Sequence, residues 1–198
     1  IPLQHVDQEE KAVKSQISLK NFLTIISPLM NDESIIKIGH NIKYDNSILN
    51  KYGIDVKGFH DTMLMSYVLD AGVNRHSMDE LASIHLNRQT IKFKDVVGSG
   101  KSQITFDRVK IEDALNYAAE DAEITFKLYI FLKKRVNQER GNYIYTNIER
   151  ELINPIQSME INGIKVDKKY LSNLSIKFSQ RIEKLEKKIY RETGSESN

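Results

Sequence analysis

The longest regular pattern in the chain is a run of helical spacing over residues 110–137. Apolar or small side chains recur there three or four residues apart, at Leu115, Ala118, Ala119, Ala122, Phe126, Tyr129, Leu132 and Val136. This period is typical of an α-helix with one buried face. The sequence therefore predicts one long helix around which the rest of the chain is organised.

Two polar residues stand out on this predicted helix. Tyr117 and Asp121 are four positions apart, so their side chains leave the helix on one face, one turn apart. The alanines between and beside them allow close packing and leave room for a cleft. A phenol next to a carboxylate can bind a metal and position a water molecule. On a solvated helix the same pair would have no function, and the pair alone does not decide between the two interpretations.

A third polar candidate, Asp45, follows the apolar run 35–39, which reads as a short buried strand. This places Asp45 just beyond a strand end, at the start of the helix predicted for residues 43–52. In α/β sheets, ligand sites form at such positions.

The remaining pattern predicts several more helices and few strands. Helices are expected at 17–30, 61–69, 77–86, 143–161 and 168–192, with a bend at Pro155. Ser18 is a candidate N-cap of the first, Asp61 looks like a cap before Thr62, and residues 77–80 have the form of a capping box. Residues 1–6 and 53–56 read as strand-like, and 87–107 as irregular. We therefore predict an α/β domain whose sheet is incomplete in this sequence.

Composition excludes several classes of site. The chain has 29 basic and 27 acidic residues, a net charge of +2, so no overall field dictates a nucleic-acid partner. It has no cysteine, which excludes disulfides, thiolate zinc sites and thiol nucleophiles. No apolar run approaches the ~20 residues that cross a bilayer. We expect a cytoplasmic protein without membrane contact.

The sequence Gly98-Ser-Gly-Lys-Ser resembles the end of a phosphate-binding P-loop, but the motif is incomplete. It requires a glycine where this chain has Asp95, and a helix after the lysine. We reject a nucleotide-hydrolysing function on these grounds.

Four ordered blocks, at residues 37–45, 59–67, 75–81 and 117–121, closely resemble the 3′→5′ exonuclease domain of bacterial DNA polymerase I, of the family A polymerases. Residues 159–167 look like the opening of the polymerase domain. The resemblance implies a ribonuclease-H-like exonuclease fold over 1–141, without its first strands. It also implies a linker helix and the first α-helical segment of the polymerase thumb over 142–198.

By this resemblance, Asp45 belongs to the second exonuclease motif, and Tyr117 and Asp121 belong to the third. All three would be catalytic, with Asp45 and Asp121 ligating Mg²⁺ or Mn²⁺ in a two-metal site. The first motif, an Asp-x-Glu pair, is expected upstream of Ile1. We therefore expect the present chain, on its own, to be inactive or nearly so.

The resemblance also implies nucleic-acid contacts for Asn41, Arg75 and Phe93. Their partner would be the single-stranded 3′ end of DNA, with primer-template DNA bound by the parent polymerase, and we expect a monomer. Each residue has a simpler interpretation. Phe93 is equally expected to cap a small core, and Arg75 to pair with a nearby acid.

Two other functions remain open. One is a catalytically dead exonuclease-like scaffold beside a family A polymerase, against which the presence of Asp45, Tyr117 and Asp121 together argues. The other is a standalone ribonuclease-D-like exonuclease, against which the polymerase-like segment 159–167 argues.

Overall fold

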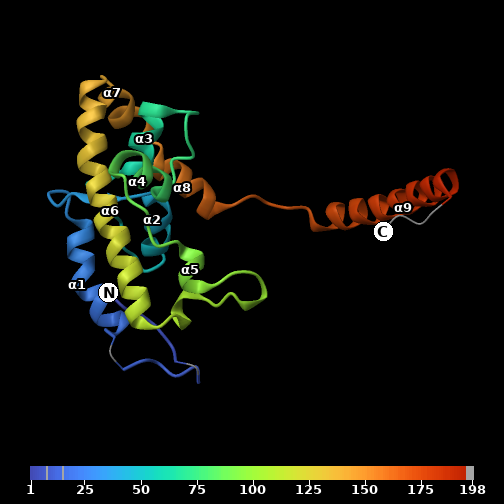
Figure 1. Cartoon of the computed structure of the whole chain (residues 1–198), viewed down its shortest axis with the longest axis horizontal. Helices are drawn as coiled ribbons and strands as arrows, with labels where there is room; N and C mark the ends of the chain where they lie inside the picture. Colours follow the sequence, from blue (N-terminus) through green and yellow to red (C-terminus); the bar gives the residue numbers. More distant parts are fainter. Residues whose placement is uncertain (8, 15, 195–198) are drawn as a thin grey trace. The chain divides into compact units, whose positions relative to one another are not determined.

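The computed structural model describes residues 1–7, 9–14 and 16–194 (Figure 1). These form two units, Ile1–Ile161 and Asn162–Asn198. Residues 142–161 therefore belong to the first unit.

Two short strands, β1 (Lys37–Gly39) and β2 (Phe59–Asp61), form a parallel pair with Lys37 opposite Phe59 and Gly39 opposite Asp61. Each strand leads into a helix, β1 into α2 (Ile42–Asn50) and β2 into α3 (Thr62–Asp70). Both helices therefore begin at the same edge of the sheet. The sheet has two strands in the described residues, in line with the prediction of an incomplete α/β sheet.

The other elements of the first unit are helical. They are α1 (Leu19–Asn31), α4 (Met78–Leu86), α5 (Phe93–Val97), α6 (Ile111–Gln138), α7 (Asn142–Ile144), a π-helical turn (Tyr145–Glu149), α8 (Ile153–Asn162) and two 3₁₀ turns, Gly100–Ser102 and Phe106–Arg108. In the second unit, α9 (Lys168–Thr193) begins at Asp167, whose carboxylate accepts a hydrogen bond from the Tyr170 amide. None of the helices among the described residues has the length and apolar character needed to cross a bilayer.

The core lies where α3 and α4 pack against α6 (Figure 1). Its fully buried members are Met65, Leu81, Ala82, Ile124, Leu128, Leu132 and Tyr145. The predicted stripe on α6 was right at Tyr129, Leu132 and Val136, which are buried, and wrong at Leu115 and Phe126, which are 57% and 55% exposed. These two residues instead line cavities of the first unit.

Several helix boundaries follow from local chemistry. The Ser18 hydroxyl accepts from the Asn21 amide and starts α1 as predicted. Helix α4 starts after Ser77 as expected, but no capping box forms. Ser77 makes no side-chain cap, and Glu80 accepts from the Arg75 amide at 3.1 Å.

Three predictions about regular structure were wrong. Residues 53–56 form no strand, although Ile54 and Val56 are buried. Residues 1–6 contribute only an isolated antiparallel bridge, from Val6 to Ala12. The bend expected at Pro155 falls earlier, at residues 150–152, because a proline in the first turn of α8 does not interrupt its hydrogen bonds.

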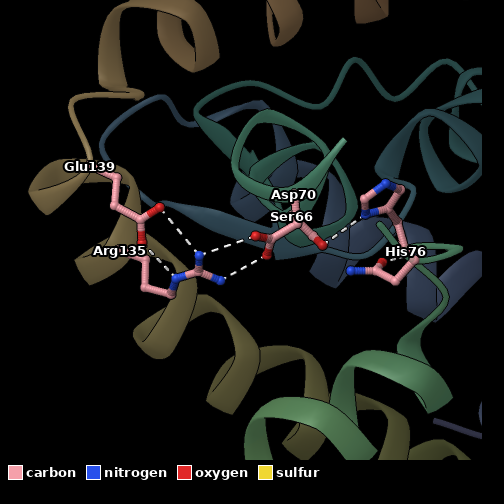
Figure 2. Close-up of polar contacts among 6 residues, drawn as sticks. Ser66, Asp70, His76, Arg135 and Glu139 are labelled. Carbon is pink, nitrogen blue, oxygen red and sulfur yellow. Dashed lines mark hydrogen bonds and ion pairs between the residues drawn. The ribbon is translucent and has the colours of Figure 1, made fainter. Parts of the chain in front are cut away.

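An ion-pair cluster fixes the end of α3 against α6 (Figure 2). Arg135 donates to both carboxylate oxygens of Asp70, at 2.8 and 3.2 Å, and through Nε to Glu139 at 2.8 Å. One turn earlier in α3, the Ser66 hydroxyl lies 2.9 Å from Nδ1 of His76. The Arg135 bonds to Asp70 hold the helix that follows Asp61 against the helix that carries Asp121.

Candidate active site

Asp45 and Asp121 line the same cleft, although they come from distant parts of the sequence. The cleft has a volume of about 480 Å³. Its other lining residues are Ile38, Gly39, His40, Met78, Ala122, Thr125 and Phe126. The end of β1, the first turn of α2, the start of α4 and the middle of α6 therefore meet around two carboxylates.

Asp45 is placed by the way in which α2 begins. Asn41 precedes the helix in a left-handed conformation (φ 62°), and Asp45 lies in the first turn. The pKa of Asp45 is raised by partial burial and then by the nearby negative charge of Asp61. A carboxylate with a raised pKa in a cleft is typical of a functional site.

The buried side chain of Asp61 controls this helix start. Its carboxylate accepts from the amides of Asn41 at 3.2 Å and Ile42 at 2.8 Å, and also caps α3. The sequence predicted the cap on α3, which is confirmed. The bonds to α2 were missed, because their partners lie 19 and 20 positions away.

Tyr117 and Asp121 interact across one turn of α6, as their spacing predicts. Burial raises the pKa of Tyr117 to about 12, and the negative charge of Asp121 adds to the effect. The pKa of Asp121 is also raised, chiefly by burial and further by Asp79 and Glu120, while the Tyr117 hydroxyl opposes the shift. Tyr117 thus remains protonated at neutral pH and can act as a hydrogen-bond donor.

Phe93 packs beside Tyr117 in a small aromatic cluster with Phe106. The ring centroids lie 6.0 Å apart for Phe93 and Tyr117, 6.0 Å for Phe93 and Phe106, and 5.9 Å for Phe106 and Tyr117. Phe106 rests on the buried residues Val97 and Val109. Phe93 therefore contacts the residues that cover a small core and still leaves 48% of its surface exposed.

Two acids hold the segment that leads to Phe93. Glu120 accepts from the Ile91 amide at 2.6 Å and pairs with Arg88 at 3.5 Å, and the Thr90 hydroxyl donates to Asp79 at 2.8 Å. The Glu120 side chain is only 13% exposed, so it is not part of a solvated helix face.

The other residues expected near DNA differ in position. Asn41 adjoins the cleft through its place before α2. Arg75 does not line the cleft. Its backbone amide donates to Glu80, and within the described ranges its guanidinium makes no ion pair, so the pairing expected for it is absent there.

An Asp-x-Glu pattern is present in the chain at Asp7 and Glu9, and the sequence expectation overlooked it. Asp7 accepts from the amides of Glu9 and Lys11, both at 2.9 Å, while Glu9 pairs with Lys11. Neither acid lines the cleft. Asp7 instead bonds to backbone amides close to it in the sequence, and neither acid adds a ligand to the cleft that holds Asp45 and Asp121.

The donor set of the cleft suits a hard cation but is small. Its two carboxylates are the ligand type that Mg²⁺ and Mn²⁺ prefer. His40 also lines the cleft, where Nδ1 lies 2.8 Å from the Thr62 hydroxyl. In the part of the chain that the structure describes, no group of three or more acidic or histidine side chains is arranged to hold a metal ion. Asp45 and Asp121 would therefore be only part of a metal site.

Comparison with known proteins agrees with this arrangement. A family model described as 3′-5′ exonuclease, that of the family A DNA polymerases, matches residues 1–137. DNA polymerase I of Rhizobium leguminosarum is 43% identical over 93% of this chain and 18% of its own length. DNA polymerase I of Pseudomonas aeruginosa is 36% identical over 100% of this chain and 22% of its own length. The chain thus spans about a fifth of these relatives.

A solved structure gives the same fold. The structure described as the POL domain of Pol1 from M. smegmatis, in complex with DNA primer-template and dNTP, is similar with a TM-score of 0.67 at 19% identity. The match covers 93% of this chain and 29% of that one. From the family match, the identities and the two carboxylates in one cleft, we conclude that the chain belongs to the 3′-5′ exonuclease family of DNA polymerase I.

Proposed function

We propose that this chain forms most of the proofreading 3′→5′ exonuclease of a DNA polymerase I, which releases 3′-terminal nucleotides as 5′-monophosphates. The observation that supports this most directly is that Asp45 and Asp121 line one cleft. In this proposal, residues 1–141 are the exonuclease domain. Residues 142–198 are the linker helix and the start of the polymerase thumb.

Asp45 and Asp121 would hold the divalent ions together with acids that this chain does not supply. When bound, two such ions stabilise the charge that develops during phosphodiester hydrolysis. The contribution of Tyr117 follows from its protonation state. Its hydroxyl stays protonated beside Asp121, so it can orient an attacking water by donating to it, and it cannot act as the base.

The DNA contacts are proposed for three residues that do not themselves line the cleft. The exposed part of Phe93, next to Tyr117, is suited to stacking on a base near the 3′ end. Asn41 adjoins the cleft, and the exposed Arg75 is free to meet a phosphate. The substrate would be a single-stranded 3′ end, delivered by the primer-template DNA of a cytoplasmic bacterial polymerase.

Alone, this chain should excise nucleotides very slowly, because two carboxylates hold two metal ions poorly. A catalytically dead scaffold is the second candidate, and the cleft argues against it. A scaffold does not need two partly buried carboxylates near a phenol. Acids with raised pKa values lower the stability of the fold when they are ionised, so they are expected where a function requires them.

A chimera tests the proposal. The matching segment of Pseudomonas aeruginosa DNA polymerase I would be replaced by this chain, and release of nucleotides from a labelled single-stranded oligonucleotide measured with Mg²⁺. We expect excision that Asp121→Ala and Asp45→Ala each reduce at least ~100-fold. Retained polymerase activity controls for folding. A chimera that polymerises but never excises, with its other acids intact, would support the scaffold instead.

A further inference from the structure

The buried Asp61 carboxylate accepts hydrogen bonds from four backbone amides. Asp61 is 1% exposed. Its Oδ1 accepts from the amides of Asn41, Met63 and Leu64, at 3.2, 2.8 and 3.3 Å, and its Oδ2 accepts from Ile42 at 2.8 Å. One side chain therefore holds the first amides of both α2 and α3, the helices that begin at the same edge of the sheet.

Tyr145 fixes the main chain of the same residue from a distant element. Its hydroxyl accepts from the Asp61 amide at 3.0 Å and lies 3.0 Å from Nδ1 of His60. The phenol is 1% exposed, and its ring stacks on His60 with centroids 5.7 Å apart. Tyr145 opens the π-helical turn after α7, beyond the family match at residues 1–137.

We propose that Asp61 and Tyr145 are positioning residues for Asp45. Tyr145 holds the backbone of Asp61, and the Asp61 carboxylate holds the amides of Asn41 and Ile42. The first turn of α2 is thereby fixed, and with it the Asp45 side chain relative to Asp121. The catalytic importance of this positioning rests on the proposed function. The hydrogen bonds that hold the start of α2 do not depend on it.

The two oxygens of Asp61 provide a selective test. An Asp61→Asn variant can keep a carbonyl oxygen facing the amides of Asn41, Met63 and Leu64. Its amide nitrogen then replaces Oδ2 and faces the Ile42 N–H, donor against donor. The cap on α3 and the bond from Asn41 survive in this variant, while the bond from Ile42, the first residue of α2, is lost.

Tyr145→Phe offers a milder change, because the ring and its stacking on His60 remain. Tyr129→Phe is a matched control. Tyr129 is a buried tyrosine whose ring also lies near His60, with centroids 5.2 Å apart. Its hydroxyl, however, bonds Lys133 at 2.6 Å and not Asp61.

Two NMR measurements on the whole chain test the proposal. Amide hydrogen exchange reports how firmly each helix start is held, and Mn²⁺-induced line broadening reports metal binding near Asp45. For Asp61→Asn we expect exchange at Ile42 to rise roughly tenfold while Met63 and Leu64 change little. We expect the Mn²⁺ concentration that broadens the Asp45 signals to rise ~10-fold. Tyr145→Phe should shift both readouts in the same direction by about threefold, and Tyr129→Phe should shift neither.

Equal loss of protection at Ile42, Met63 and Leu64, or equal effects of Tyr145→Phe and Tyr129→Phe, would overturn the proposal, because both describe general loosening. The hydrogen-exchange rate at Ile42 tests the positioning role of Asp61 even when no metal is bound. If wild-type Mn²⁺ broadening misses the cleft while Ile42 behaves as expected, the proposed function fails and the helix positioning stands.

Discussion

Asp45 in the first turn of α2 and Asp121 in the middle of α6 line one cleft, and the pKa of each is raised above its ordinary value. For both, burial is the leading cause, followed by neighbouring carboxylates. The neighbouring carboxylate is Asp61 for Asp45, and the neighbours are Asp79 and Glu120 for Asp121. An acid whose ionised form is disfavoured in this way reduces stability at neutral pH. Asp45 and Asp121 therefore have consequences for stability as well as for chemistry.

Replacing Asp121 with asparagine should stabilise the chain at neutral pH. An acid with a raised native pKa takes up a proton at higher pH in the folded state than in the unfolded state. The penalty of its charge is therefore full above the native pKa and absent below the unfolded value of 3.8. We expect the free energy of unfolding to rise by about 0.5–1 kcal/mol at neutral pH, and the gain to vanish in acid.

Urea unfolding across the acid range measures this effect. Asp70→Asn is the control of opposite sign, because hydrogen bonds from Arg135 lower the pKa of Asp70. That variant should be less stable than wild type at neutral pH, with the difference shrinking as the pH falls below 3.8. A loss of stability in Asp121→Asn at neutral pH would contradict the reading of Asp121 as a functional carboxylate.

Removing the Arg135 side chain should destabilise the first unit. The guanidinium makes two bonds to Asp70 and two to Glu139, and its side chain is 24% exposed. We expect Arg135→Ala to lower the free energy of unfolding by about 1–2 kcal/mol, because the pair is two-pronged and partly shielded from water. Arg108→Ala, which breaks an exposed pair with Glu10, should change it by less than about 0.5 kcal/mol. Similar losses of unfolding free energy in both variants would show that the Arg135 ion pairs stabilise the chain no more than an exposed pair does.

His60 should make the chain sensitive to mild acid. Burial, with Lys133 and Arg150 nearby, lowers its pKa from 6.5 to about 4. A base with a depressed native pKa contributes stability above its unfolded pKa and loses it as the pH falls through the native one. The loss should therefore run from pH 6.5 to about 4.

We expect this loss to be on the order of 1–2 kcal/mol, because the half-buried ring remains screened by water. The measurement is the free energy of unfolding against pH, alongside the imidazole titration by NMR. In His60→Phe the slope over this window should flatten. An unchanged slope would assign the acid sensitivity to other groups.

Phe93 should carry much of the affinity for single-stranded DNA. We expect Phe93→Ala to weaken binding of a labelled oligothymidylate by about 1–2 kcal/mol, because one base loses its stacking partner. Phe131→Ala is the control, since Phe131 is also an exposed phenylalanine, at 37%, but its ring stacks on His85 and not beside Tyr117. Fluorescence anisotropy gives both affinities. Equal weakening by the two variants would remove Phe93 from the proposed interface.

The sequence predicted the features that depend on neighbours in the chain. The long helix, the cap at Ser18 and the Tyr117–Asp121 pair each arise within one or two helical turns. Strand β2 escaped prediction because Phe59-His-Asp61 has no apolar run, whereas β1, which is equally short, lies in the apolar run 35–39. Tyr145 meets Asp61 across 84 positions, and Glu120 reaches Ile91 across 29. Such contacts depend on how distant elements pack together, which no local sequence pattern predicts.

The most direct measurement of the central claim is Mn²⁺-induced line broadening in the NMR spectrum of the whole chain. One ion in the cleft should broaden signals from Asp45 and Asp121 together at the lowest Mn²⁺ concentrations, and Asp121→Asn should weaken the effect at both. Broadening of Asp121 with Asp45 untouched, or of both residues at unrelated concentrations, would show that the two carboxylates do not share a cation.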